Sequence, residues 1–357
     1  MNSDAPFISI LIPAYNRPEL LLLAIRSVLA NSFQDFEIIV SDDRSPRRDE
    51  VIAALESFAT ESRLCWFVQP TNLGWSKNRN FLLAKARGRL VWLMGDDDLL
   101  PPDALERLAR FVKKHPDRDI YACAYEVINE TGRHLYARSA GKELLHDWSD
   151  RFALRQLLRS QVLPFWLFHP FTFAYRRELG VRFPYREQAY IGDDLFFLFE
   201  CAAAGKSIAI SPEVMFSWRK FSPLTAKSPH AQINLSSDIN GIRARARICD
   251  LIEATPPVRN LVLGLFPDGD FVQRFLHDSV RSGNNDSHNE LLARIISDPE
   301  LGPRFKDYHN PHPGRARLKI RLYMIYAFLR LTGPEGLLQL IRRTWREHVQ
   351  VPDPTKI

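Results

Sequence analysis

Short apolar runs alternate with amphipathic stretches through the first 128 residues, and this alternation limits the chain to few folds. Each run is continuously apolar, which is typical of strands that are buried on both faces. The predicted strands are 7–12, 36–41, 64–69, 90–94 and 120–128, and the predicted helices are 17–32, 48–62, 77–86 and 101–114. Strands of this kind joined by helices form a mainly parallel sheet flanked by helices, so we expect an α/β, Rossmann-like fold.

The composition is that of a folded protein without a membrane span. The chain has 357 residues and is 45% hydrophobic, which suits one large α/β domain with extensions or two ordinary domains. No stretch reaches the roughly 20 apolar residues of a spanning helix, and the N-terminus lacks the pattern of a signal peptide. The four cysteines are far apart and have no metal-ligand spacing. We therefore expect a cytoplasmic protein.

The net charge of +6 is concentrated near the C-terminus. Residues 310–350 contain eight basic and two acidic residues, which equals the whole excess. A local basic segment on a nearly neutral chain argues against a nucleic-acid partner. Two alternatives stay open for this basic amphipathic segment: peripheral contact with an anionic membrane surface, or packing on the rest of the chain, including a contact between copies in a homo-oligomer.

Polar residues follow the predicted strands, at 13–17, 42–45, 71–80 and 95–98. Ligands of parallel sheets bind beyond the carboxyl ends of the strands, so these residues are the candidates for a site. Three adjacent carboxylates, Asp96, Asp97 and Asp98, repel one another and resist burial, and they predict a bound Mn²⁺ or Mg²⁺. The alternative is a solvated cluster of the kind that caps helices.

Two further pairs suggest what such a metal would accompany. Asp42 and Asp43 can accept hydrogen bonds from a ribose or a base, and Lys77 and Arg79 can offset the charge of a diphosphate. The chain has neither the GxGxxG of dinucleotide-binding folds nor the GxxxxGK[ST] of P-loops. We therefore predict a site for a metal-bound nucleoside diphosphate.

In this order, the segments resemble the inverting glycosyltransferases of family 2, which have the GT-A fold. The resemblance covers about residues 7 to 225 and rests on ISILIPAYNR (8–17), VSDDRS (40–45), NLGWSKNRN (72–80), MGDDD (94–98) and IGDDLFFLFECAAAG (191–205). It implies a sugar transferred from a nucleotide diphosphate-sugar, a UDP-sugar first, to a glycan or lipid-linked glycan. It also implies Mn²⁺ or Mg²⁺ as cofactor.

The resemblance assigns roles to individual residues. Asp97 would be the principal metal ligand with Asp96 and Asp98 in support, and Asp194 the catalytic base with Asp193 beside it. The nucleotide-sugar contacts would be Pro13, Tyr15, Asn16, Arg17, Asp42, Asp43, Lys77, Arg79 and Asp96. The acceptor contacts would be His169, Thr172, Arg176 and Arg219. Helix capping remains the alternative for Asp194, and a packed structural role for His169.

The chain departs from the family pattern at three positions. Gly95 stands where many members have an aspartate, and Arg44 and Asn78 replace the usual glycine and alanine.

The expected organisation is a GT-A catalytic domain over 1–230, with a nucleotide-sugar half (1–125) and an acceptor half (126–230). A helical extension over 231–309 and the basic segment from 310 to 357 follow. A role in bacterial surface polysaccharide assembly, such as lipopolysaccharide, capsule or exopolysaccharide, follows from the resemblance together with the basic segment. The alternatives are a noncatalytic nucleotide-sugar-binding or scaffold protein and a sugar-phosphate nucleotidyltransferase.

Overall fold

The computed structural model describes residues 5–147, 171–221, 239–265 and 292–305. The chain divides into two compact units, Met1–Ser282 and Gly283–Ile357. The first unit contains the sheet and all elements discussed below. Within the second, residues 292–297 are helical and η3 spans Gly302–Phe305. This division differs from the predicted boundaries near residues 230 and 310, which stay predictions.

The first half of the chain alternates strands and helices as the sequence predicts. The elements are β1 (Ile8–Ala14), α1 (Pro18–Leu29), β2 (Phe36–Asp42), α2 (Arg48–Glu56), β3 (Leu64–Val68), α3 (Trp75–Lys85), β4 (Leu90–Leu93), α4 (Ala104–Lys114) and β5 (Ile120–Ile128). Helix α4 begins at Ala104, three residues later than predicted, with Asp103 at its N-cap. The side chain of Asn31 caps it by accepting a hydrogen bond from the Leu105 amide at 2.9 Å.

The second half adds strands of both directions. The elements are β6 (His134–Arg138), β7 (Leu144–Asp147), β8 (Phe173–Arg176), α6 (Arg177–Arg182), η1 (Glu187–Gly192), α7 (Asp193–Ala203), β9 (Ser207–Arg219), α8 (Ile239–Ala254) and α9 (Pro256–Leu265). The strand order is β3-β2-β1-β4-β8-β5-β9-β7, with β6 paired to β5. Strands β3, β2, β1 and β4 are parallel, β8 enters antiparallel between β4 and β5, and β9 runs parallel to β5.

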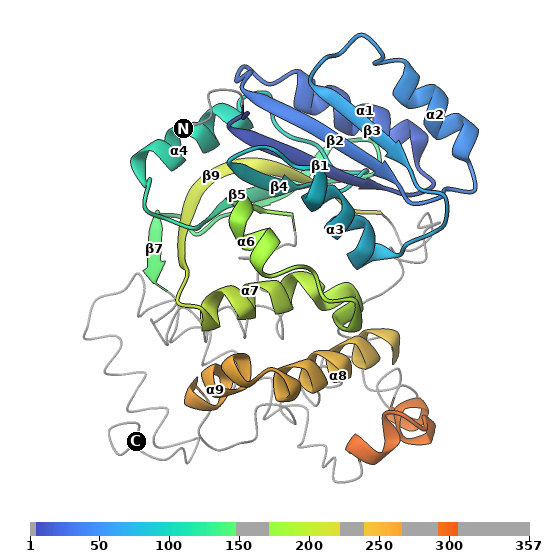
Figure 1. Cartoon of the computed structure of the whole chain (residues 1–357), viewed down its shortest axis with the longest axis vertical. Coiled ribbons are helices and arrows are strands. Elements are labelled where there is room, and N and C mark those ends of the chain that lie inside the picture. The colour runs from blue at the N-terminus through green and yellow to red at the C-terminus, as the bar shows by residue number, and fades with distance from the viewer. Residues whose placement is uncertain (1–4, 148–170, 222–238, 266–291, 306–357) are drawn as a thin grey trace. The chain divides into compact units, whose positions relative to one another are not determined.

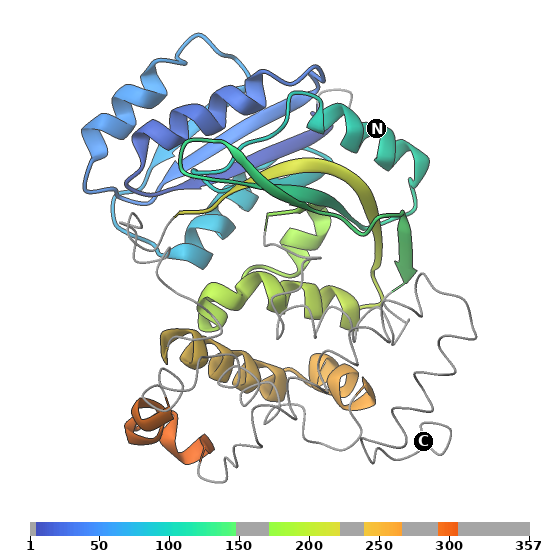
Figure 2. The same cartoon turned by 180° about the vertical axis from the view of Figure 1, so that it is seen from behind.

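Helices cover both faces of this sheet. Helices α1, α2 and α4 lie on one face, and α3, α6 and α7 lie on the other (Figures 1 and 2). Helix α8 packs against η1, and α9 packs against α7. The predicted mainly parallel α/β fold flanked by helices is therefore confirmed. None of the helices in the described ranges has the length and apolar character to span a bilayer.

The register of the parallel strands brings their carboxyl ends to one edge. Ala14 at the end of β1 pairs with Asp42 at the end of β2, and Asp42 pairs with Val68 of β3. The loop after β4 joins the same edge, because the Met94 amide donates to the Leu11 carbonyl at 2.9 Å. The polar segments that follow the four strands therefore lie together.

Candidate active site

The three carboxylates after β4 point to different partners. An oxygen of Asp96 accepts a hydrogen bond from the Tyr15 amide at 2.8 Å, so it ties this loop to the loop after β1. An oxygen of Asp98 accepts one from the Arg219 amide at the end of β9, also at 2.8 Å. Asp96 and Asp98 are 6% and 1% exposed, whereas the side chain of Asp97 is 18% exposed. Asp97 is therefore the carboxylate most accessible to a ligand.

Arg17 supplies positive charge to this cluster. One of its terminal nitrogens donates to Asp96 at 3.1 Å and also to Asp97. Its guanidinium carbon lies 5.7 Å from the centre of the Phe221 ring. Arg17 is the last residue of the PAYNR segment. The nucleotide contact predicted for Arg17 would therefore lie beside the predicted metal ligands.

Burial controls the ionisation of the cluster. Burial raises the pKa of Asp96 to about 7, although the charge of Arg17 acts in the opposite direction. Burial also raises the pKa of Asp97, against Arg17, and raises that of Asp98 well above its ordinary range, with the charge of Asp97 adding to the effect. A cation at this position would hold all three groups ionised.

The donor set of the cluster fits Mg²⁺ or Mn²⁺ that is shared with a diphosphate. Such ions bind to one or two protein carboxylates and leave several positions to phosphate and water. Asp97 and the adjacent oxygen of Asp96 already hold a cationic group, the Arg17 guanidinium, between them. Among the described residues, no group of three or more His, Cys, Asp or Glu side chains is placed to hold a metal ion. Asp97 and Asp96 would therefore supply only part of the coordination shell of such an ion.

Gly95 permits the folded-back position of these carboxylates. A Cβ atom at residue 95 would lie 2.6 Å from an oxygen of Asp98 and 2.9 Å from one of Asp97. Both distances are too short for a carbon atom, so an aspartate in the family position would displace the two side chains. Glycine at position 95, in place of the family's aspartate, therefore allows the conformation that this loop adopts.

Arg219 has a structural position beside the cluster. Its guanidinium donates to the backbone carbonyls of Asp97 at 2.7 Å, Glu130 at 2.8 Å and Asn129 at 3.2 Å, and the residue is 3% exposed. These bonds join the end of β9 to the GDDD loop. The acceptor contact predicted for Arg219 stays a prediction, while its described bonds hold the metal-ligand candidates in place.

The two aspartates after β2 accept hydrogen bonds from nearby backbone. Asp42 is fully buried and accepts bonds from the amide and hydroxyl of Ser45. Asp43 accepts bonds from the amides of Leu73 at 2.6 Å and Gly74 at 2.9 Å. Neither aspartate caps the following helix, because α2 begins at Arg48 without a side-chain cap. Asp43 instead connects the end of β2 to the loop before α3.

The PAYNR segment contributes backbone more than side chains. Pro13 is buried in β1, Tyr15 is half-buried and Asn16 is exposed with a positive φ of 60°. The Asn16 amide donates to the Ser45 hydroxyl at 2.8 Å. PAYNR, VSDDRS, NLGWSKNRN and GDDD are therefore connected by hydrogen bonds at one edge of the sheet.

Lys77 and Arg79, predicted together as phosphate contacts, differ completely in environment. Lys77 is exposed and forms an ion pair with Glu187 at 3.2 Å. Arg79 is 1% exposed and pairs with Asp193 at 2.8 Å. The burial of Arg79 places its guanidinium against the start of α7, away from solvent.

Asp193 and Asp194 begin α7 and are both buried, at 0% and 7% exposure. Burial raises the pKa of Asp193, against the charge of Arg79. Burial and then the charge of Asp193 raise the pKa of Asp194 to about 7. A carboxylate that titrates near neutrality is suited to accept and release a proton at working pH.

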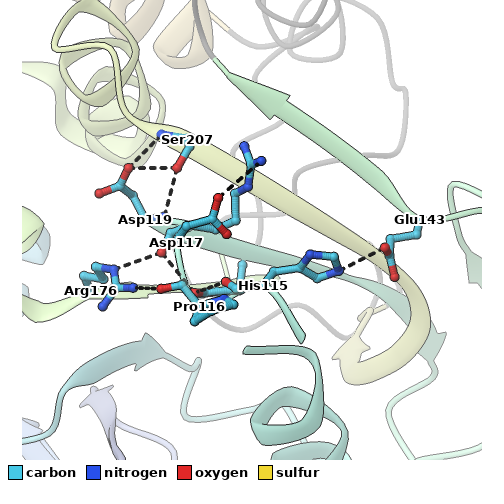
Figure 3. Close-up of polar contacts among 9 residues, drawn as sticks. His115, Pro116, Asp117, Asp119, Glu143, Arg176 and Ser207 are labelled. Carbon is cyan, nitrogen blue, oxygen red and sulfur yellow. Dashed lines mark hydrogen bonds and ion pairs between the residues drawn. The ribbon is translucent and has the colours of Figure 1, made fainter. Parts of the chain in front are cut away.

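The predicted acceptor residues are not brought together. Arg176 ends β8, opposite the first residue of β4, because β8 is antiparallel. Its guanidinium donates to the carbonyls of Arg118, at 2.9 Å, and Pro116 (Figure 3). Arg176 thus lies at the amino edge of β4, opposite the carboxylate cluster, and the acceptor role predicted from the resemblance does not fit its position. Thr172 is fully buried, and His169 lies outside the described residues.

Sequence reasoning missed the residues that enclose Arg79. Trp75, Phe171 and Tyr185 place their rings 4.0, 5.2 and 5.2 Å from the guanidinium carbon. Ser76 donates its hydroxyl to Asp193 at 2.7 Å. The signal present in the sequence was the i, i+1, i+4 spacing of Trp75, Ser76 and Arg79, which places the three on one face at the start of α3.

Comparisons with known proteins indicate the family that the chain resembles. Residues 9–180 match the family model described as Glycosyl transferase family 2. An uncharacterized glycosyltransferase of Rickettsia typhi is 30% identical over 136 residues, which are 38% of this chain and 41% of that protein. One of Methanocaldococcus jannaschii is 22% identical over 219 residues, 60% of this chain and 71% of that protein. The chain therefore spans less than half the length of the Rickettsia relative.

Solved structures show the same fold at low identity. S. aureus TarS 1–349 in complex with UDP-GlcNAc has a TM-score of 0.56 at 16% identity, covering 85% of this chain and 93% of that chain. The mannosyltransferase PcManGT of Pyrobaculum calidifontis, in complex with GDP-Man and Mn²⁺, has a TM-score of 0.50 at 15% identity, covering 95% and 85%. Residues 9–180 thus match glycosyltransferase family 2, and the fold is of the GT-A type.

Proposed function

We propose that this chain is a metal-dependent, inverting glycosyltransferase. The observation that carries the proposal is the convergence of four separated segments at one sheet edge. The Tyr15 amide bonds to Asp96, the Asn16 amide bonds to Ser45, and Asp43 accepts from Leu73. Convergence at the carboxyl ends of parallel strands, with an acid cluster in the centre, favours a bound nucleoside diphosphate.

The proposed donor is a nucleotide diphosphate-sugar. Asp97, supported by Asp96, would hold Mn²⁺ or Mg²⁺, and the ion would offset charge on the departing diphosphate. The match to the family supports this class of donor. The TarS and PcManGT complexes with UDP-GlcNAc and with GDP-Man and Mn²⁺ make UDP- and GDP-sugars the first to test, with UDP-sugars ahead.

The chain's own residues supply the proton transfer. Asp194, with a pKa raised to about 7, accepts the proton of an acceptor hydroxyl as the oxygen attacks the anomeric carbon. The attack occurs on the face opposite the leaving diphosphate, so one step inverts the configuration. The buried environment of α7 excludes water from the side of the base.

The acceptor we propose is a glycan or a lipid-linked glycan in bacterial surface polysaccharide assembly, such as lipopolysaccharide, capsule or exopolysaccharide. The basic segment at 310–350 would bring the enzyme to an anionic surface on the inner face of the cytoplasmic membrane. This segment lies outside the described residues, and the proposal rests on its charge pattern.

The test is thermal unfolding with UDP, GDP, CDP, dTDP and CMP, each with and without Mn²⁺. Wild type should show a rise in Tm with one nucleotide that requires the metal, because a ligand of the native state stabilises it by mass action. Asp97→Ala should lose that rise, and Asp117→Ala, at an exposed aspartate outside the site, should keep it. If no nucleotide changes the Tm with any metal, the donor site is refuted.

The noncatalytic alternative is separated by turnover. A scaffold that binds nucleotide sugars would show the same Tm shifts and would be indifferent to the loss of Asp194. Release of nucleoside diphosphate from UDP-GlcNAc or GDP-mannose should therefore be compared between wild type and Asp194→Ala. Equal release from both would favour the binding protein.

A further inference from the structure

The loop before α3 and the first turn of α3 form hydrogen bonds with two acidic residues of the proposed site. On one side, Asp43 accepts hydrogen bonds from the Leu73 and Gly74 amides. On the other side, Asp193 accepts hydrogen bonds from Ser76, at 2.7 Å, and from Arg79, at 2.8 Å. Residues 73–79, which we call the bridge segment, thus connect the end of β2 to the start of α7.

The bridge segment holds Asp193 with two side-chain donors, the Ser76 hydroxyl and the Arg79 guanidinium. The Trp75 side chain also acts to lower the pKa of Asp193, so residues i, i+1 and i+4 of α3 all act on one carboxylate. Asp193 is fully buried, and Ser76, whose hydroxyl reaches it, is 5% exposed. A carboxylate with this many partners has one orientation, and α7 begins at that residue.

Arg79 is placed to bind Asp193 and is not accessible to a ligand from solvent. Its guanidinium is 1% exposed and lies among the rings of Trp75, Phe171 and Tyr185. Its Nε atom is buried and has no hydrogen-bond partner among the described residues. Asp193 is the carboxylate with which it forms an ion pair. Because the Arg79 guanidinium is removed from water, losing its ion pair with Asp193 would be strongly unfavourable.

From this geometry we propose that Arg79 is a positioning residue that fixes Asp193, and through it Asp194, relative to the donor-binding edge. The inference rests on the proposed function, since it takes Asp194 as the base. It assigns Arg79 a role other than contact with base or phosphate. It also gives the bridge segment a function, which is to hold the donor-binding loops and the base of α7 in one rigid arrangement.

Asp193 and Arg79 act on the pKa of Asp194 in opposite directions. Among the charged groups, Asp193 of α7 has the largest effect on Asp194 and raises its pKa, and Arg79 of α3 lowers it. On the neighbouring elements, Glu187 of η1 is paired with Lys77, and α8 presents the Ile248 side chain to Gly192. Removing the negative charge of Asp193 and leaving Arg79 in place must therefore lower the pKa of Asp194.

The first experiment substitutes Arg79→Met and compares Arg79→Lys, which keeps the charge. The rate is the release of nucleoside diphosphate from UDP-GlcNAc or GDP-mannose, and the affinity for UDP or GDP comes from calorimetry. Arg79→Met should lower kcat on the order of 100-fold, the cost of a misplaced reacting group, and leave the nucleotide Kd unchanged. Arg79→Lys should recover part of kcat. Lys85→Met, at the other end of α3, is the matched control.

The opposite split would overturn the proposal. If Arg79→Met weakens nucleotide binding in proportion to the loss of rate, Arg79 contacts the donor instead. If it changes neither quantity, the bridge segment does not position the base. Should Arg79→Met fail to fold, Ser76→Ala replaces it, because it removes one bond to Asp193 and keeps both charges. Ser76→Ala should lower kcat several-fold with unchanged nucleotide affinity, and a wild-type kcat would refute the proposal.

The main readout of the second experiment needs no turnover. Asp193→Asn should lower the pKa of Asp194 by about one unit, measured by ¹³C spectra of labelled aspartate with Asp194→Asn as the assignment control. The acid limb of the rate profile should move to lower pH by the same amount. An unchanged pKa of Asp194 would refute the coupling. If the coupling is present while no donor is turned over, the proposed function fails and the coupling stands.

Discussion

Two groups of buried carboxylates, the Asp193 and Asp194 pair and the cluster after β4, are balanced in different ways. The Asp193 and Asp194 pair is enclosed, and it has its own cation in Arg79, which is 1% exposed. The cluster after β4 is partly open, since the side chains of Asp97 and Arg17 are 18% and 22% exposed. The Asp193 and Asp194 pair has its counter-charge within the chain. The cluster after β4 is accessible to a cation from solvent.

This difference separates two tasks of one proposed reaction. A base must keep its orientation and a pKa near the working pH, and an enclosed ion pair provides both. A metal site must gain and lose its ion and its diphosphate, so at least one carboxylate has to remain accessible. Substitutions that break one group at a time should therefore separate the two tasks.

Asp194→Asn should reduce the rate of sugar transfer 100- to 10,000-fold, the usual contribution of a positioned base. The amide has the size of the carboxylate but cannot accept the proton, so nucleotide affinity should stay at the wild-type value. Steady-state release of nucleoside diphosphate and calorimetry with the matching nucleotide measure the two quantities.

The same substitution at Asp117, which is exposed and outside the site, is the control for this experiment. In wild type the rate should rise with pH up to about pH 7, where the buried base becomes ionised. A variant Asp194→Asn with a wild-type rate would assign the proton transfer to another group and remove the functional contrast between the two carboxylate groups.

In the cluster after β4, Asp97→Ala should mainly reduce metal affinity, and Asp98→Ala should mainly reduce the free energy of unfolding. Asp97→Ala should weaken Mn²⁺ binding at least 10-fold in the presence of nucleotide, because it removes the most accessible carboxylate. Asp98→Ala removes the acceptor of the buried Arg219 amide, and it should cost about 1 to 3 kcal/mol of unfolding free energy.

Paramagnetic resonance of free Mn²⁺ and urea unfolding measure these two effects. Asp103→Ala, at the partly exposed residue before α4, controls for the loss of an acidic side chain. Equal losses of metal affinity in the two variants would mean that both side chains ligate the ion, contrary to their different exposure.

The sequence predicted the fold well because its signal is local. Continuous apolar runs and the polar residues after them identified β1 to β5 and the edge where the motifs meet. The position of β8 was missed, since an antiparallel strand that inserts between β4 and β5 leaves no mark in the order of motifs. Arg176 was misplaced for the same reason, because strand direction decides the edge to which a residue belongs.

The site was predicted at the level of segments and less well at the level of side chains. Asp97 has the exposure expected for a metal-ligand candidate. Arg79 and Lys77 are two residues apart and chemically alike, yet one is buried and the other exposed. Their difference depends on Asp193, which is more than 100 residues away. Long-range pairing of this kind cannot be read from spacing along one chain.

A smaller effect of Asp194→Asn should appear in stability. The folded-state pKa of about 7 exceeds the value near 3.9 of an unfolded chain, so the native state holds the proton longer. Wild-type stability therefore falls as the pH rises from about 4 to 7. Asp194→Asn should be more stable than wild type by up to about 4 kcal/mol at pH 8 and equal to it at pH 4, as measured by urea unfolding at the two pH values. A constant difference at both pH values would contradict the enclosed character of this pair.

The smallest expected effect belongs to Arg44, which follows the two aspartates after β2. Arg44 is exposed and has a φ of 63°, a left-handed conformation that glycine adopts without cost. Arg44→Gly should change the unfolding free energy by less than about 0.5 kcal/mol, because the relief of strain is offset by the entropy that glycine loses on folding. Arg44→Val should lower it by about 1 kcal/mol or more, since a β-branched residue tolerates this conformation poorly. Chemical unfolding of both variants checks the pair. If valine were neutral, the loop that holds Asp42 and Asp43 would have to be adaptable, and the donor edge would then be less rigid than the α7 pair with which it is compared.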